Sequence, residues 1–89
     1  MLAITIAQLN PMVGDIEGNA QKMIGTAAQA VREGADLVVF TELSLTGYYP
    51  GDLLDEPGFM DRVAQGIQTL RQASAQNPAL HWEIGRAHV

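Results

Sequence analysis

The chain has 89 residues, with five Lys and Arg against ten Asp and Glu, which gives a formal net charge of −5 at pH 7. This acidic balance argues against nucleic acids and anionic membranes as partners, because both are bound through clusters of Lys and Arg. The sequence has no apolar run near the roughly 20 residues of a membrane span and no leader peptide pattern, so we expect a cytoplasmic protein. It also contains no cysteine, which excludes a disulfide, a thiolate metal site and a cysteine nucleophile within these residues.

The first half of the chain predicts a strand, a helix and a second strand. Leu2–Leu9 is a nearly continuous apolar run, which is typical of a strand buried on both faces. Turn residues follow, and Asn19 is predicted to cap a helix with an amphipathic pattern as far as Val31. Gly34 supplies the left-handed residue after the helix, and Ala35–Thr41 is the second apolar run. This order indicates a right-handed βαβ unit with parallel strands, so the fold class is α/β.

The second half predicts a loop, a second helix and the start of a third strand. Residues 42–54 contain two glycines and one proline without a sustained period, which indicates a loop. Asp55, Glu56 and Pro57 form a helix start, and apolar residues then recur at helical spacing towards Asn77-Pro78. A chain of this length buries only about 60% of the surface of its unfolded form, so such a sheet would be marginally stable alone.

The last seven residues resemble a foreign sequence. Ile84–Val89 can be encoded by a nucleotide sequence that resembles a common sequencing adapter, and the codon at the junction gives Glu83. We therefore expect residues 83–89 to be an adapter-derived tail. Residues 1–82 are then expected to be the truncated N-terminal part of a larger domain, with an incomplete third strand.

Glu42 is the strongest candidate for catalysis. Ligands of parallel α/β sheets bind outside the carboxyl ends of the strands, which places Gln8, Asn10, Thr41 and Glu42 at the candidate site. Glu42 comes directly after the second apolar run, so we expect a partly dry environment that favours its neutral form, as suits a general base. On the residues alone, a solvated or loop-capping glutamate is equally compatible.

Other residues carry weaker signals. Tyr48 and Tyr49 offer a phenolic donor or a stacking surface in the loop after Glu42, although loop tyrosines more often close the edge of a core. His81 and His88 have no metal-ligand company, so no metal site is expected. The glycines after the first strand form neither a dinucleotide fingerprint nor a P-loop, so no cofactor is expected in this chain.

Three motifs resemble the glutamine-dependent NAD synthetases of the nitrilase, or carbon–nitrogen hydrolase, superfamily. They occur in order and without gaps over about residues 1 to 80. The motifs are Gln8-Leu9-Asn10-Pro11 with Val13-Gly14-Asp15-Ile16-x-Gly18-Asn19, then Phe40-Thr41-Glu42-Leu43-Ser44-Leu45-Thr46-Gly47-Tyr48, and then Pro50-x-Asp52-Leu53-Leu54.

The resemblance implies a fold and an activity for a full-length protein. The fold is the nitrilase-like αββα sandwich, of which this chain would be the start. The activity is glutamine hydrolysis by a Glu, Lys and Cys triad, in which Glu42 matches the general base and Tyr48 matches a tyrosine at the glutamine pocket. Ammonia then passes to a synthetase domain, which uses ATP and magnesium to amidate nicotinic acid adenine dinucleotide to NAD. A homo-oligomer is implied for the full-length protein.

The chain departs from this pattern because the triad cysteine and lysine of the family lie further along a full chain. We therefore expect residues 1–89 alone to be inactive. A stand-alone nitrilase-like amidase of a small carbon–nitrogen substrate is the alternative function. A non-enzymatic, flavodoxin-like binding module is a third possibility, but it leaves Glu42 and the tyrosine loop unexplained.

Overall fold

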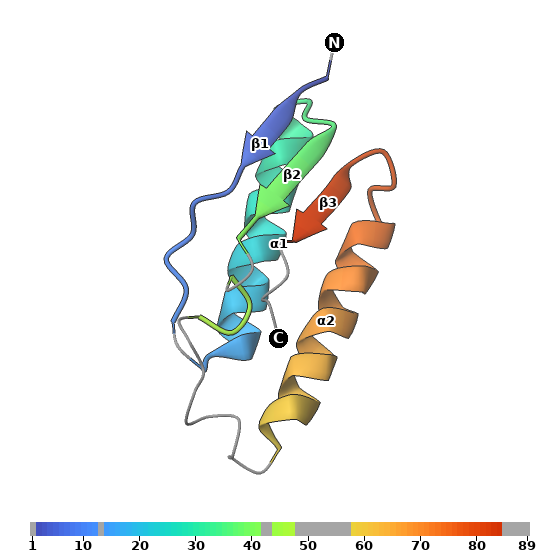
Figure 1. The fold of residues 1–89 in the computed structure, drawn as a ribbon. Coiled ribbons are helices and arrows are strands. Elements are labelled where there is room, and N and C mark those ends of the chain that lie inside the picture. Colours follow the sequence, from blue (N-terminus) through green and yellow to red (C-terminus); the bar gives the residue numbers. More distant parts are fainter. Residues whose placement is uncertain (1, 13, 42–43, 48–57, 85–89) are drawn as a thin grey trace.

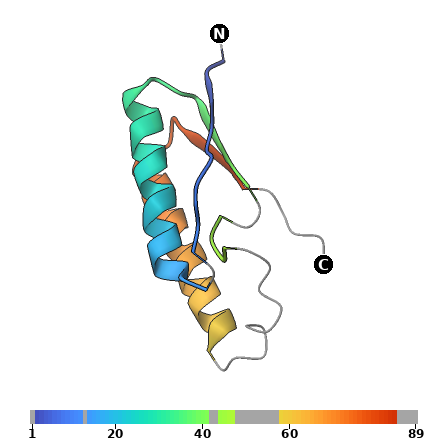
Figure 2. The ribbon, with the colours of Figure 1, turned by 90° about the vertical axis from the view of Figure 1, so that its left-hand side faces the viewer.

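The computed structural model describes residues 2–12, 14–41, 44–47 and 58–84. Within these residues the chain order is β1 (Ile4–Ile6), α1 (Ile16–Arg32), β2 (Leu37–Phe40), α2 (Phe59–Ala75) and β3 (His81–Ile84). The three strands form one parallel sheet in the order β1-β2-β3 (Figure 1). Both crossovers step across the sheet in the same direction, so α1 and α2 lie side by side on one face (Figure 2). The predicted α/β class and parallel βαβ unit are confirmed.

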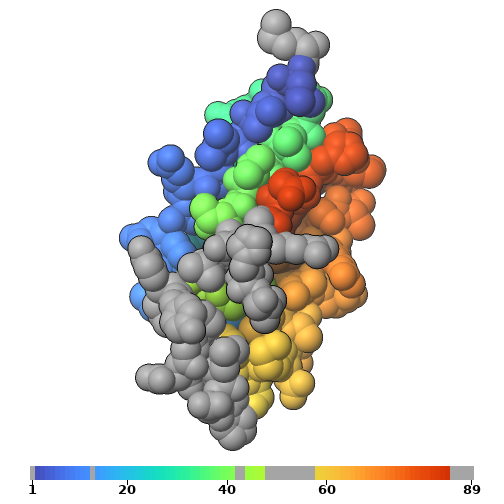
Figure 3. All heavy atoms as spheres, in the orientation of Figure 1, coloured from blue at the N-terminus to red at the C-terminus, as the bar shows by residue number. Residues whose placement is uncertain are grey.

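The two faces of the sheet differ in burial. Val38 pairs with Thr5 on one side and with Trp82 on the other, and Val38 is fully buried beneath the helices. Ile4 and Ile6 flank Thr5 in β1, so their side chains point to the opposite face of the sheet, and their exposed fractions are 52% and 71%. Atoms of all three strands are visible on this side of the molecule in Figure 3. The prediction that the first strand is buried on both faces is therefore wrong for the chain as described, because the described helices cover one face only.

Helix α1 begins earlier than predicted. Asp15, rather than Asn19, is the N-cap, and its side chain accepts a hydrogen bond from the Gly18 N–H at 3.1 Å. A carboxylate at this position satisfies one of the free amide hydrogens of the first turn and lies at the positive end of the helix dipole. Asn19 lies one turn further on, on the buried face. Gly34 has a φ of +78° just after the helix, as predicted.

Helix α2 packs beside α1, and only some of its apolar residues are buried. Its first residue is Phe59, and its N-cap is Gly58, with a φ of +84° and no side-chain capping bond. The predicted start at residues 55–57 lies outside the described residues. Phe59, Val63, Ile67, Leu70 and Ala73 are the apolar residues at helical spacing; Phe59 and Leu70 are buried, whereas Ile67 is 42% exposed. Neither described helix is long and apolar enough to cross a membrane.

Strand β3 forms where a third strand was expected. It pairs with β2 from His81, opposite Leu37, to Ile84, opposite Phe40. The rings of Phe40 and Trp82 lie 5.5 Å apart between their centroids, at 46°. The strand extends across the boundary between residues 82 and 83 that the sequence analysis predicts.

Candidate functional site

The carboxyl ends of the three strands point the same way, and the segments that follow β1 and β2 run on to the first turns of α1 (Figure 1). Gln8, Asn10 and Thr41, which the sequence analysis assigns to these ends, are described and exposed. Glu42 and Tyr48, the predicted base and pocket residue, lie outside the described residues. The described residues on either side of Glu42 are Thr41 and residues 44–47, and hydrogen bonds to other segments hold them in place.

Asn19 connects the segment after β1 to the segment after β2. Its side chain is completely buried. The Asn19 Oδ1 accepts a hydrogen bond from the Met12 N–H at 2.8 Å, and Nδ2 donates to the Met12 carbonyl at 2.7 Å and to the Leu45 carbonyl at 2.8 Å. Both amide hydrogens are used, so this buried polar group is fully satisfied as a donor. One helix side chain thus holds two loops that are more than 30 residues apart in sequence.

Asn19 is predicted from its type and position to cap the helix, and the structure gives it this different role. The available signal was its spacing, because Asn19 lies three residues after Ile16, next to Ala20 and four residues before Met23. These three residues belong to the buried face of α1. An asparagine on such a face needs buried partners, and the irregular segments at the sheet edge offer free backbone groups.

Further hydrogen bonds fix the segment after β2 on both sides of residues 42 and 43. The Gly14 N–H donates to the Thr46 carbonyl at 2.9 Å, which is a second connection between the two loops. The Ser44 N–H donates to the Thr41 carbonyl at 3.2 Å, and the hydroxyls of Thr41 and Ser44 lie 3.0 Å apart. Ser44 is only 1% exposed. Thr41 and Ser44, the described neighbours of the predicted base, are therefore held in one arrangement.

The side chain of Leu45 is buried and packs against α2. A Cβ atom added at Gly66 of α2 would lie 2.6 Å from Cγ2 of Ile16 and 3.2 Å from Cδ1 of Leu45. The glycine therefore allows α2 to approach Ile16 and Leu45 closely. Leu45 is held at both ends, by its carbonyl through Asn19 and by its side chain against α2.

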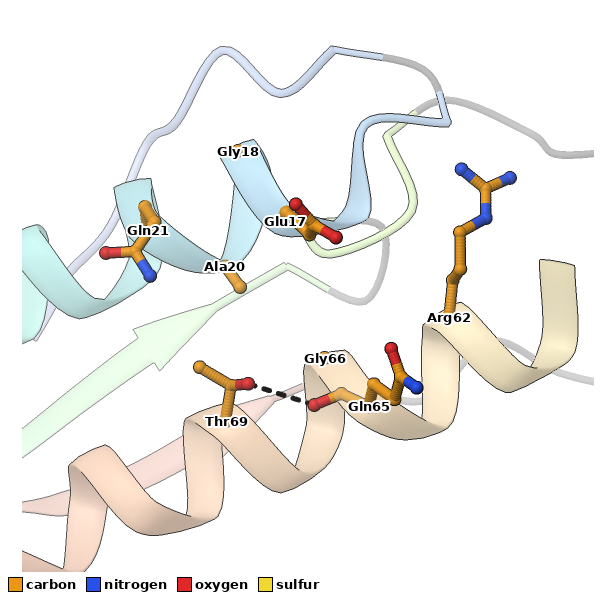
Figure 4. Close-up of a pocket in the computed structure, with 8 residues that line it drawn as sticks. All are labelled: Glu17, Gly18, Ala20, Gln21, Arg62, Gln65, Gly66 and Thr69. Carbon is orange, nitrogen blue, oxygen red and sulfur yellow. Dashed lines mark hydrogen bonds between the residues drawn. The ribbon is translucent and has the colours of Figure 1, made fainter. Parts of the chain in front are cut away.

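Two clefts lie beside this unit. A polar cleft of about 420 Å³ separates the first turns of α1 from α2, with Glu17 and Gln21 on one side and Gln65, Gly66 and Thr69 on the other (Figure 4). An apolar groove of about 390 Å³ runs between α2 and β3 and includes Leu45 in its lining.

The described residues supply a scaffold rather than a complete catalytic set. In the described part of the chain, no three His, Cys, Asp or Glu side chains gather as a metal site. Lys22, the single lysine of the sequence, is exposed, and its Nζ donates to the Asn10 carbonyl at 2.9 Å. What the arrangement does chemically is to hold a loop that begins at the carboxyl end of β2, where a catalytic carboxylate would meet a substrate.

Comparison with known proteins shows the family. The carbon–nitrogen hydrolase family matches residues 3–81, so this chain belongs to that family. The chain is 44% identical over 72 residues to a glutamine-dependent NAD(+) synthetase from Synechocystis, a match that covers 81% of this chain and 13% of the relative. It is 47% identical over 70 residues to one from Aquifex aeolicus, covering 79% of this chain and 12% of that relative.

The fold is shared with a solved structure of the same kind. The glutamine-dependent NAD+ synthetase from Acinetobacter baumannii, in complex with ADP, matches with a TM-score of 0.72 and 40% identity. The match covers 78% of this chain and 13% of that one. The chain therefore spans about an eighth of the length of the relatives it matches. The resemblance to glutamine-dependent NAD synthetases is confirmed, and the described sheet and helices are an incomplete piece of the nitrilase-like fold.

Proposed function

We propose that this chain is the N-terminal part of a glutamine-dependent NAD synthetase and carries one member of its glutaminase triad. The observation that carries the proposal is the match of residues 3–81 to the carbon–nitrogen hydrolase family, joined to more than 40% identity with two synthetases. The full-length protein would hydrolyse glutamine and use the ammonia to amidate nicotinic acid adenine dinucleotide. ATP and magnesium would be needed in a synthetase domain beyond these residues, and the protein would act in the cytoplasm as a homo-oligomer.

In this proposal Glu42 is the general base. Its carboxylate takes the proton from the thiol of a cysteine supplied by the rest of the protein, and the thiolate attacks the amide carbon of glutamine. The carbon–nitrogen bond breaks as the protonated Glu42 gives that proton to the leaving nitrogen, ammonia departs, and a thioester remains that water hydrolyses to glutamate. Tyr48, six residues after Glu42, is proposed to contact glutamine. Residues 1–89 contain no cysteine, so they are proposed to be inactive alone, and residues 83–89 are proposed to be foreign to the protein.

The test is a paired assay of Glu42→Gln in the full-length protein, with glutamine or ammonia as the nitrogen source. Glutamine at this position keeps the shape of the side chain but cannot accept the thiol proton. Loss of a general base costs about 10²- to 10⁴-fold, so glutamine-driven NAD formation should fall by that factor. Ammonia-driven formation should be unchanged, because it does not need the triad.

Glu33→Gln is the matched control, because Glu33 is an exposed glutamate just after α1. It should leave both activities unchanged. Equal loss of both activities in Glu42→Gln would assign Glu42 a folding role instead. A wild-type protein that hydrolyses amides but forms no NAD from ammonia would be a stand-alone amidase, and the proposal would be wrong.

A further inference from the structure

We propose that Asn19 is a positioning residue for the glutamine site, acting through Leu45 on the segment that carries Glu42. The inference rests on the proposed function and deepens it. Leu45 follows Glu42 by three residues, and its backbone carbonyl accepts a hydrogen bond of 2.8 Å from Asn19 Nδ2. Asn19 has no place in the proton transfer itself. Its role would be to fix where the base stands relative to the thiol.

The chemistry of this position requires an amide. Asn19 donates to two carbonyl groups, those of Met12 and Leu45, and accepts from the Met12 N–H. A carboxylate of the same shape keeps the accepted bond but turns an oxygen towards both carbonyls, which repels them. An alanine removes all three hydrogen bonds and leaves the buried Leu45 carbonyl without this donor. Among the twenty side chains, only asparagine offers this donor set at this length.

Few other described hydrogen bonds hold the segment after β2 against the segment after β1. Asn19 connects Leu45 to Met12, and the Gly14 to Thr46 backbone bond of 2.9 Å is the second described connection between the same two segments. Among the described residues, loss of the Asn19 contacts leaves that backbone bond as the hydrogen bond between the two segments. Small displacements of a catalytic group are costly, because a shift of about 1 Å lowers rates by about 10²-fold.

A second observation supports Leu45 as the residue through which the position of the segment is fixed. Its side chain packs where α2 carries Gly66, and a Cβ atom at Gly66 would come within 3.2 Å of Leu45 Cδ1. The side chain is 8% exposed. An added Cβ would lie closer still to Ile16 Cγ2, at 2.6 Å, so a substitution at Gly66 presses on Ile16 and Leu45, whose side chains make none of the hydrogen bonds of Asn19.

The test is Asn19→Asp in the full-length protein, with the paired nitrogen assay and with kcat and KM for glutamine measured separately. We expect kcat with glutamine to fall about 10- to 100-fold with a smaller change in KM, since a displaced base affects the reaction step. Ammonia-driven synthesis should stay within about two-fold. Asn77→Asp is the matched control, because Asn77 is exposed after α2, and it should change neither activity.

Gly66→Ala is the second variant, because it leaves the Asn19 side chain in place, presses on Leu45 from α2 and gains helix propensity. It should lower the glutamine-driven kcat several-fold and leave ammonia-driven synthesis unchanged. Parallel loss of both activities in Asn19→Asp, in step with the folded fraction, would mean a structural role only and overturn the inference. If Asn19→Asp does not fold, Gly66→Ala decides, and an unchanged glutamine-driven kcat there also overturns it. The proposed function fails separately, when Glu42→Gln itself shows no selective loss.

Discussion

Two glycines of α1 predict opposite responses to the same substitution. Gly18 and Gly25 both lie inside the helix, and neither is among the described glycines with positive φ. Their backbone conformations therefore do not require glycine. Replacing glycine with alanine inside a helix stabilises it by about 0.8–1.0 kcal/mol, because alanine loses less backbone entropy on folding.

The atoms around each glycine decide whether the alanine substitution stabilises or destabilises the fold. A Cβ atom added at Gly25 meets no atom within 4 Å, so Gly25→Ala should give the full gain. A Cβ atom added at Gly18 would lie 2.8 Å from Cγ of Asp15 and 3.0 Å from Oδ1, the atom that accepts the capping hydrogen bond. The new methyl group therefore displaces the cap, which costs about 0.5–2 kcal/mol. Gly18→Ala should be neutral or destabilising by about 1 kcal/mol.

The assay is thermal unfolding of residues 1–89, followed by circular dichroism at 222 nm. A change of 1 kcal/mol shifts the Tm of a domain of this size by about 4–8 °C, so Gly25→Ala should raise it by nearly that amount. Gly18→Ala should leave the Tm unchanged or lower it. In an Asp15→Ala background the cap is absent, so Gly18→Ala should then stabilise like Gly25→Ala. Equal gains for both glycine variants in the wild-type background would refute the reasoning.

Two further predictions concern stability. Met23→Ala should cost about 2–5 kcal/mol, because Met23 is fully buried, whereas Met60→Ala should stay within about 0.5 kcal/mol, because Met60 is 60% exposed. Urea titration followed by the fluorescence of Trp82, the single tryptophan, measures both, and equal midpoints would contradict the burial. Gly34→Ala should cost about 1–2 kcal/mol from its φ of +78° alone, since no atom lies within 4 Å of an added Cβ, and the same titration checks it.

Local pattern was enough to predict the elements of this fold. Two apolar runs and two amphipathic stretches predicted the order of strands and helices. This works because burial of one face imposes a characteristic spacing of apolar residues on each element, and that spacing can be read from the sequence alone. The helix start was harder. Asp15 and Asn19 are both good capping residues, one turn apart, and intrinsic preference does not separate them. The tertiary partners of Asn19, which lie in two distant loops, decide the outcome, and no local pattern contains them.

The prediction that the first strand is buried on both faces is wrong for a different reason. A continuous apolar run predicts that both faces are covered, but it does not say which part of a protein covers each. Ile6 is 71% exposed here because the described helices lie on the other face. The motif around Glu42 was recognisable from sequence through its resemblance to the glutamine-dependent NAD synthetases. The contacts of Asn19 with Met12 and Leu45 were not, since they depend on how α1 sits on the sheet.

Hydrogen bonds connect the first two of the three sequence motifs in the structure. The first motif, ending at Asn19, includes the Gly14 amide, and the second, beginning at Phe40, includes the Leu45 and Thr46 carbonyls. The two motifs are therefore one hydrogen-bonded unit at the carboxyl edge of the sheet, although some 20 residues of helix and strand separate them. A catalytic carboxylate in the second motif would take its position from the first. Substitutions in either motif should then affect the same reaction step, and their effects should not add.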